Sequence, residues 1–257
     1  MSHDLKKNKI LKKFLGILGY KILPKETVKT ERIIESSAFN CLDFIKFLIA
    51  EKKINQIIQV GANDGKSDDF LRDSINKDTA VLLVEPIKSA FSELKKNYSN
   101  FVNVKFVNKA IDISNDKKKI YSVDPKYYEY YERKYNAKDV SWLTVLASFQ
   151  KNHLKNHGVK LKHIQSTEIE CVTFNDLISQ FNFNQLGLLV IDTEGYDSVL
   201  VKNFLESTNI KPIIIFEWIH MTTKETQDLV ELLKANNYKF LKVNKDLICI
   251  QNNFIFS

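Results

Sequence analysis

The feature that most constrains the fold of this chain is a repeated pairing of a short apolar segment with a helical one. Four of the apolar segments read "QIIQV", "AVLLVEP", "LGLLVIDTEG" and "PIIIFEW". They are apolar at nearly every position, as expected of parallel strands whose two faces are both covered by helices. The pattern predicts βαβ units and an α/β fold with a doubly wound sheet.

Further segments extend this sheet. The stretch "VKFVNKAI" (residues 104–111) predicts a strand, "IECVTFNDLI" (169–178) predicts a strand that leads into a helix, and residues 67–75 predict a helix. Near the carboxyl end, "YKFLKV" and "DLICIQ" are joined by the tight link "NKD", which predicts an antiparallel hairpin. We therefore expect a mostly parallel seven-stranded sheet that is completed by a C-terminal antiparallel hairpin.

The chain is expected to have two main parts and an insert. Residues 1–53 predict an N-terminal helical extension, in which "SSAFNCLDFIKFLIAEKK" is the clearest amphipathic helix. Residues 54–257 predict the main domain. Its strand–helix rhythm breaks over residues 114–167, which hold a tyrosine-dense stretch and a histidine-bearing helix. We expect this insert to form a lid over the substrate side of the domain.

Composition restricts the compartment and the partners. The three cysteines are far apart and odd in number, which argues against a disulfide framework or a cysteine-based zinc site and favours a reducing, cytoplasmic compartment. The net charge of +7 weakly favours anionic surfaces, but no nucleic-acid-binding motif accompanies it, so we expect no nucleic acid partner. No apolar run is long enough to span a bilayer.

The amino end, "LKKNKILKKFLGILGYKIL", is basic and amphipathic and has two interpretations. It is a helix packed on its own domain, or it lies on an anionic membrane face. Its apolar centre is short and no small-residue cleavage site follows, so no signal peptide is predicted. The second interpretation would bring a cytoplasmic protein into peripheral contact with the inner face of the membrane.

The turn after the first strand indicates the kind of ligand. Gly61 permits a sharp turn, and Gly65 lets the backbone approach a ligand closely. A dinucleotide site would have the pattern G-x-G-x-x-G, with bare backbone N–H groups facing a pyrophosphate. Here the loop reads "GANDG", and the carboxylate of Asp64 would repel that pyrophosphate. S-adenosylmethionine carries an ammonium and a sulfonium and has no phosphate, so it fits the loop better.

The second strand ends in Glu85, at the distance where an acidic residue accepts both hydroxyls of an adenosine ribose. The same distance suits NAD, so Glu85 does not separate the two cofactors. A surface carboxylate before a proline is the structural alternative.

At this point the chain resembles the FkbM family of S-adenosylmethionine-dependent methyltransferases. The similar segments include "IIQVGANDGKSDDF", "LLVEPIKSAFSELKKNY", "LASFQKNH", "LLVIDTEGYDSVL" and "PIIIFEW", and they span about residues 54 to 220. The resemblance implies a class I methyltransferase (Rossmann-like) fold and an acceptor hydroxyl on a sugar or a secondary metabolite. The cofactor residues that it implies are Gly61, Ala62, Asn63, Asp64, Gly65, Glu85, Pro86, Ala110 and Asp192.

One position departs from the pattern of many class I methyltransferases. They carry an acidic residue two positions before the first glycine, where this chain has Gln59. The methionine ammonium would then be held by backbone carbonyls and by Asp64, which leaves its contacts open.

Methyl transfer to an alcohol needs positioning and a base that accepts the hydroxyl proton. Asp192 and Glu194 follow a buried strand, so Glu194 is a candidate base and Asp192 an orienting group, or the reverse. Alternatively, one of them caps the following helix. Glu217 and His220 follow the next strand and are further catalytic candidates, although an exposed histidine after a strand is often incidental.

The insert supplies candidates for the acceptor side. His153 and His157 in "HLKNH" share a helical face, but no acidic third ligand is near them in sequence, so we expect no metal and assign His153 to the acceptor. Tyr128, Tyr131 and Tyr135 would line one face of a helix and could stack on a sugar ring. The alternatives are a solvated histidine pair and a helix packed on the sheet.

Three functions therefore compete. The leading hypothesis is an O-methyltransferase acting on a sugar of a surface polysaccharide or glycolipid. The second is a methyltransferase acting on nucleic acid or protein, and the third is a cofactor-binding component of a glycan-assembly complex without catalysis. Neither the acceptor nor the oligomeric state follows from the sequence.

Overall fold

The computed structural model describes residues 41–254 except residues 52, 67–70, 137–139 and 141. The expected extension over residues 1–53 lies outside the described residues except for its end, where a helix is observed. The helices are α2 (Cys41–Ala50), α3 (Lys88–Asn97), α4 (Tyr128–Tyr135), α5 (Trp142–Val145), α6 (Lys151–Asn156), α7 (Phe174–Phe181), α8 (Asp197–Ser207) and α9 (Thr223–Ala235), with 3-10 turns η1 (Pro125–Tyr127) and η2 (Leu161–His163).

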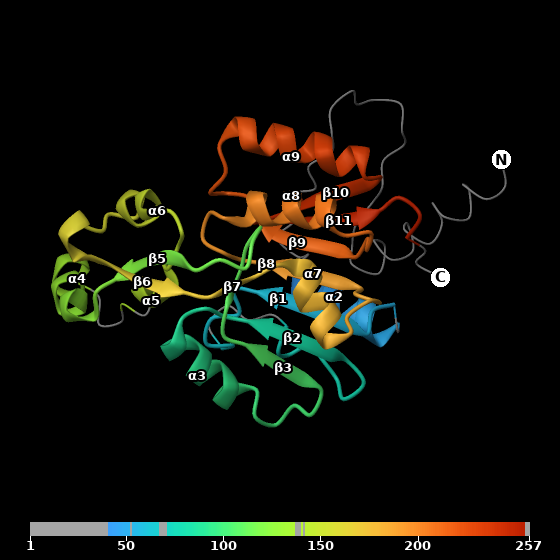
Figure 1. Cartoon of the computed structure of the whole chain (residues 1–257), viewed down its shortest axis with the longest axis horizontal. Helices are drawn as coiled ribbons and strands as arrows, with labels where there is room; N and C mark the ends of the chain where they lie inside the picture. Colours follow the sequence, from blue (N-terminus) through green and yellow to red (C-terminus); the bar gives the residue numbers. More distant parts are fainter. Residues whose placement is uncertain (1–40, 52, 67–70, 137–139, 141, 255–257) are drawn as a thin grey trace.

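A seven-stranded sheet forms the centre of the molecule, in the order β10-β11-β9-β8-β1-β2-β3 (Figure 1). Its strands are β1 (Gln56–Val60), β2 (Ala80–Val84), β3 (Val104–Val107), β8 (Leu188–Ile191), β9 (Ile213–Glu217), β10 (Tyr238–Val243) and β11 (Asp246–Gln251). Every pairing is parallel except those of β11, which runs antiparallel to both β9 and β10. This arrangement confirms the predicted mostly parallel sheet with a C-terminal antiparallel hairpin.

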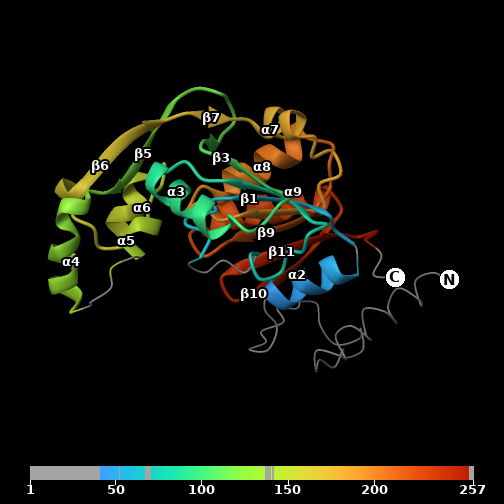
Figure 2. The same cartoon turned by 90° about the horizontal axis from the view of Figure 1, so that it is seen from below.

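Helices cover both faces of the sheet, which explains why its strands are apolar throughout. Helices α7, α8 and α9 pack on one face, and α2 and α3 on the other (Figures 1 and 2). On β1, Ile58 faces the first layer, while its neighbour Ile57 faces the second. Both side chains are fully buried, as period-two alternation on a doubly covered strand requires.

Two predicted elements differ in the structure. The segment 104–111 is not one strand: β3 ends at Val107, and β4 (Ala110–Ile111) leaves the sheet to pair with β7 (Cys171–Val172). Asn108 interrupts the strand because its side-chain amide donates to the backbone oxygens of Glu85 and Pro86, at 2.9 and 3.0 Å. Of the helix predicted over residues 67–75, the described part is a turn.

The chain between β4 and β7 forms an excursion that projects from the end of the sheet (Figures 1 and 2). The antiparallel strands β5 (Lys118–Val123) and β6 (Ile164–Ile169) form its stem. Helices α4, α5 and α6 lie around these two strands (Figure 1). It has its own small core, which includes Val123, Tyr131 and Leu154. The tyrosine-bearing helix α4 therefore packs within the excursion. The alternative that it packs on the main sheet is wrong.

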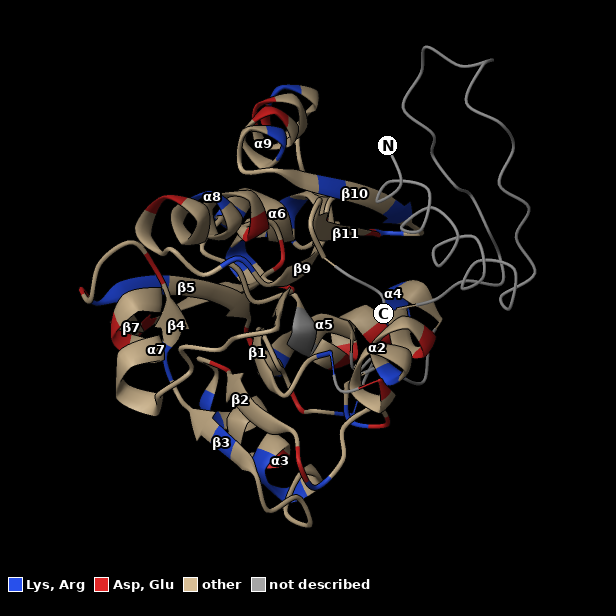
Figure 3. Cartoon of the chain, turned by 90° about the vertical axis from the view of Figure 1, so that its right-hand side faces the viewer, with Lys and Arg blue, Asp and Glu red and all other residues tan. Residues whose placement is uncertain are grey.

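Charge is spread evenly over the described residues. In the view of Figure 3, segments with basic and with acidic residues are interspersed along the ribbon. Residues 1–40 hold nine Lys and Arg against four Asp and Glu, so they carry five of the chain's seven net positive charges. Among the described residues, no helix is both long and apolar enough to cross a membrane.

The core assignment predicts a large difference between two isoleucines. Replacing Ile58, which is fully buried on the central strand, with alanine should lower the free energy of unfolding by about 2–5 kcal/mol, because a cavity remains. The matched change Ile113→Ala removes a side chain that is 60% exposed and should cost less than about 0.5 kcal/mol. Urea denaturation measures both, and equal losses would contradict the packing described.

Candidate functional site

The turn after β1 approaches the end of β8 so closely that only glycine fits. Gly61 has a φ of +80°, and a Cβ built there would lie 1.7 Å from the backbone oxygen of Asp192. Gly65 also has a positive φ, and its Cβ would lie 2.5 Å from the Leu94 side chain on α3. The two glycines therefore let the turn close tightly between α3 and β8.

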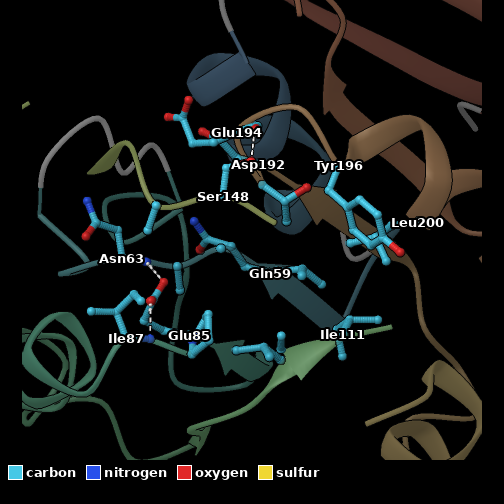
Figure 4. A pocket seen from close by; sticks show the side chains of 18 of the residues that line it. Gln59, Asn63, Glu85, Ile87, Ile111, Ser148, Asp192, Glu194, Tyr196 and Leu200 are labelled. Atoms are coloured by element: carbon cyan, nitrogen blue, oxygen red, sulfur yellow. Dashed lines mark hydrogen bonds between the residues drawn. The ribbon is translucent and has the colours of Figure 1, made fainter. Parts of the chain in front are cut away.

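Glu85, at the end of β2, is bound by the same turn. Its two carboxylate oxygens accept hydrogen bonds from the backbone N–H groups of Asn63, at 2.9 Å, and Ile87, at 2.7 Å (Figure 4). The side chain is only 5% exposed, and burial raises the pKa of Glu85 to about 7 despite these two bonds. Each oxygen retains a lone pair with which it can accept from a ligand hydroxyl.

A cavity opens above the carboxyl ends of the strands, where ligands bind in open α/β sheets. The space above these strand ends is continuous with solvent and measures about 1150 Å³ with that open space included. It is lined by strand ends and turns and by one segment of the excursion: residues 59–63, 84–87, 109–111, 147–149 and 192–194, together with Ile120, Val190, Tyr196, Leu200 and Lys245.

Gln59 and Asp64 are placed differently from what the sequence suggested. Gln59 is buried, lines the cavity, and its side-chain oxygen has no hydrogen-bond partner within the described residues. Gln59 stands two positions before Gly61, where many class I methyltransferases carry an acidic residue. The Asp64 carboxylate accepts from the backbone N–H of Lys66 at 2.9 Å and does not line the cavity. Asp64 therefore shapes the turn, and the expected repulsion of a pyrophosphate does not act inside the cavity.

Asp192 and Glu194 lie at the opposite side of the cavity from Glu85, with Gln59 between them (Figure 4). Burial and the charges of Glu217 and Glu194 raise the pKa of Asp192 to about 7. Asp192 does not cap the following helix, because the N-cap residue of α8 is Tyr196 and no side chain makes a capping bond there. The buried carboxylate of Asp197, in the first turn of α8, accepts instead from the N–H and hydroxyl of Thr193 at 3.3 and 3.1 Å.

Glu194 has a φ of 52°, a left-handed conformation that is uncommon for glutamate. The excursion holds it there, because the Ser148 hydroxyl donates to the Glu194 backbone oxygen at 2.8 Å. The Gln150 side chain also donates to the Gly195 oxygen at 2.8 Å. The excursion thus positions the residue that lies at the mouth of the cavity.

Glu217 and His220 lie beside Glu194 but do not line the cavity. His220 Nε2 is 3.0 Å from Glu217 Oε2 and 3.8 Å from Glu194 Oε2, and the bond to Glu217 raises the pKa of His220. Burial pushes the pKa of Glu217 upward, but the His220 bond and the charge of Lys245 outweigh it, so this pKa is lowered. Lys245, from the β10–β11 turn, gave no signal in the sequence.

The structure also brings the two histidines of α6 to this point. His153 Nε2 lies 2.9 Å from Glu194 Oε2, and the rings of His153 and His220 are 4.7 Å apart. The His157 ring lies 4.6 Å from that of His153. The acidic partner that the sequence lacked near "HLKNH" is therefore supplied by the loop after β8.

The three tyrosines predicted to bind the acceptor lie elsewhere. Tyr131 is fully buried in the core of the excursion, and its hydroxyl is bonded to the Lys160 backbone and the His163 ring, both at 2.9 Å. Tyr135 stacks on Tyr131, and Tyr128 packs against the same core. None of the three lines the cavity, because this face of α4 is used for packing, which corrects the expectation.

Together these features fit S-adenosylmethionine. The glycine turn and the buried Glu85 suit a ribose, and the unpartnered oxygen of Gln59 suits an ammonium. In the sheet, the single antiparallel strand, β11, is the second strand from one edge. This fold and this site define a class I S-adenosylmethionine-dependent methyltransferase.

The family model described as "Methyltransferase FkbM domain" matches residues 59–240, which is more than half of the chain. The chain belongs to this family of methyltransferases, and S-adenosylmethionine is its cofactor. No curated protein matches the chain.

Several solved structures are similar at low identity. Cofactor-bound Rv0187 from MTB has 10% identity and a TM-score of 0.45, and the match covers 95% of this chain and 91% of that one. A putative caffeoyl-CoA O-methyltransferase from Staphylococcus aureus has 16% identity, a TM-score of 0.43 and the same coverage. The Methanococcus jannaschii fibrillarin pre-rRNA processing protein has 11% identity and a TM-score of 0.40, with 89% and 84% covered. The assignment to a class I methyltransferase rests on the family match and the strand order and not on these low-identity structures.

The raised pKa of Glu85 predicts pH-dependent cofactor binding. A carboxylate is a better acceptor for ribose hydroxyls than a carboxylic acid, so binding has to deprotonate Glu85 when the pH is below about 7. Its contribution to the affinity for S-adenosylhomocysteine should fall roughly tenfold between pH 8 and pH 6. Calorimetric titration at the two pH values measures this change.

The variant Glu85→Gln provides the comparison. It should bind at least about tenfold more weakly at pH 8, since it loses charged hydrogen bonds, and its affinity should depend less on pH. The change Glu93→Gln, on the exposed surface of α3, is the control and should leave binding unchanged. A wild-type affinity that is equal at both pH values would contradict the role given to Glu85.

Proposed function

We propose that the protein is an O-methyltransferase that methylates a hydroxyl of a sugar in a surface polysaccharide or glycolipid. The observation that carries the proposal is the arrangement of one cavity. It has a ribose-binding carboxylate, Glu85, on one side and an acceptor-side carboxylate, Glu194, in contact with imidazoles at its mouth. The proposal deepens the family's methyl-transfer activity by naming the acceptor.

Most of the work of the enzyme is positioning. The bound cofactor supplies a methyl group on a sulfonium, which is already a good leaving group. Glu85 and the turn of Gly61 to Asn63 hold the nucleoside half, and Gln59 and Asp192 offer acceptors on the other side of the cavity. Phe149 and Tyr196, whose rings contact edge to face at 5.0 Å, help to wall the cavity against water. An acceptor oxygen held in line with the methyl carbon then reacts with little further help.

The hydroxyl proton must leave as the new bond forms. Glu194 is the carboxylate at the mouth, and its bond to His153 orients it there. His220 is the neighbouring imidazole, oriented in turn by Glu217. A base within reach of the hydroxyl contributes to the rate, and this group of side chains is placed where it can serve.

A sugar suits the mouth better than a nucleic acid does. The cavity lining combines the carboxylates of Asp192 and Glu194, which can bond hydroxyls, with the aromatic side chains of Phe149 and Tyr196, against which a sugar ring can pack. Outside residues 1–40 the net charge is only +2, from the chain's +7 less the +5 of those residues, and charges of both signs are interspersed (Figure 3). Phosphate binding needs a concentrated basic surface. Peripheral membrane contact through the basic amino end remains part of the proposal, and that end lies outside the described residues.

The test is transfer of labelled methyl from S-adenosylmethionine to neutral mono- and oligosaccharides, with total RNA and a protein mixture offered in parallel. Label recovered as a sugar methyl ether supports the proposal. Label in RNA or protein alone would overturn the sugar acceptor. If S-adenosylhomocysteine binds but no acceptor is labelled, the non-catalytic alternative replaces it.

Glu194→Gln should lower kcat by roughly 10²-fold or more, because the carboxylate that faces the acceptor is lost. Its affinity for S-adenosylhomocysteine should change little, since the ribose is held on the other side of the cavity. The control is Glu168→Gln, an exposed carboxylate on β6, which should leave both quantities unchanged. Steady-state kinetics and calorimetry separate the two effects, and an unchanged kcat in Glu194→Gln would refute its assignment.

A further inference from the structure

Three imidazoles and one carboxylate converge beside the cavity, which is lined by the carboxylate, Glu194, and not by the imidazoles. His153, His157, His220 and Glu194 each offer one ligand atom, and these four atoms all lie within 4.8 Å of one another. They come from three separate segments: α6 in the excursion, the loop after β8 and the turn after β9. Three of the chain's five histidines therefore share one small volume.

The surroundings favour a cation there. Glu194 Oε2 already contacts two of the imidazoles, at 2.9 Å to His153 and 3.8 Å to His220. Glu217 binds His220 with one oxygen, at 3.0 Å, and Lys245 with the other, at 3.4 Å. Glu217 therefore adds a second negative charge directly beside the cluster.

The backbone around the cluster is also fixed in place. Ser148 and Gln150 donate to the backbone oxygens of Glu194 and Gly195, both at 2.8 Å. Gly195 has a φ of +92°, and a Cβ there would lie 3.3 Å from His153 Nδ1, so a larger residue would crowd the ring. His153 itself is 7% exposed. Two of the four ligands, Glu194 and His153, are thus held by the fold.

We propose that His153, His157, His220 and Glu194 bind one divalent transition-metal ion of the zinc class. Three imidazole nitrogens with one carboxylate oxygen form a ligand set that suits Zn²⁺ and Co²⁺, whereas Mg²⁺ and Ca²⁺ favour sites made of oxygens. The sequence could not indicate the site, because "HLKNH" gains its acidic and third imidazole ligands only in the fold. The ion joins the excursion to the main domain across the mouth of the cavity.

The proposed metal site is argued from the geometry of its four ligands alone. A role of the ion in catalysis depends in addition on the proposed function. At the mouth, the cation would lie next to the acceptor hydroxyl and favour loss of its proton to water. The oxygen would then take the methyl carbon as the carbon–sulfur bond breaks. In that case Glu194 acts as a metal ligand and not as the base.

Metal uptake is measured directly on the full chain, without a histidine tag and after treatment with a chelator. Titration with Co²⁺ should produce the visible absorption of a low-coordinate cobalt centre at one ion per chain, and Zn²⁺ should displace it. Zn²⁺ should also raise the melting temperature, because only the folded chain assembles the site. Absence of a cobalt spectrum and of a melting shift in the wild type would overturn the proposal.

His157→Asn and His220→Asn should each weaken Co²⁺ binding by at least about tenfold. The control, His163→Asn, removes an imidazole that contacts Tyr127 and Tyr131 and not the cluster, and should leave Co²⁺ binding unchanged. Binding of S-adenosylhomocysteine reports that each variant is folded. If both ligand variants bind Co²⁺ like the wild type, the ion lies elsewhere and the proposal fails.

The two proposals fail separately. Methyl transfer to a sugar by a protein that takes up no metal would remove this inference and leave the proposed function. Metal uptake at the cluster without any methyl transfer would leave the site and remove the proposed function.

Discussion

The approach of the β1 turn to the end of β8 is the constraint on which the rest of the site depends. At Gly61 the backbone passes so near the Asp192 carbonyl that any side chain would occupy the same space. This contact lets the turn reach back to β2, where the Asn63 N–H binds Glu85, and it leaves Asp192 at the facing side of the cavity. One close backbone contact therefore sets the spacing between the two carboxylates that would grip the cofactor.

Several acidic side chains lie close together in a partly buried region at the carboxyl ends of the central strands. Asp192, Glu194 and Glu217 all lie there, and their mutual repulsion and burial are visible in the raised pKa of Asp192. Lys245 from the terminal hairpin offsets part of this charge, and His153 from the excursion makes a hydrogen bond with Glu194. A cationic ligand, whether a sulfonium or a metal ion, is stabilised by the negative charge that remains.

Much of the fold followed from the sequence because its signals were local. Uniformly apolar strands such as "LGLLVIDTEG" required burial on both faces, and the hairpin required only a short link between two strands. The break at Asn108 was not visible, since it depends on carbonyl groups at Glu85 and Pro86. The spacing of the tyrosines in α4 indicated that they share one helix face. It did not indicate whether a ligand or the rest of the excursion covers that face.

The sequence by itself determined the class of the protein. The strand–helix alternation predicted the doubly wound sheet, and motifs such as "IIQVGANDGKSDDF" and "LLVIDTEGYDSVL" carried the resemblance to the FkbM family that the family match confirms, because each depends on residues close together in the chain. Only the tertiary structure decided what lies at the mouth of the cavity. It placed Asp64 outside the cavity lining, left the buried Gln59 oxygen without a partner among the described residues, and brought Glu194 together with three histidines from two other segments. Contacts between residues so far apart in the chain are set by the packing of the excursion against the sheet, and no local pattern encodes them.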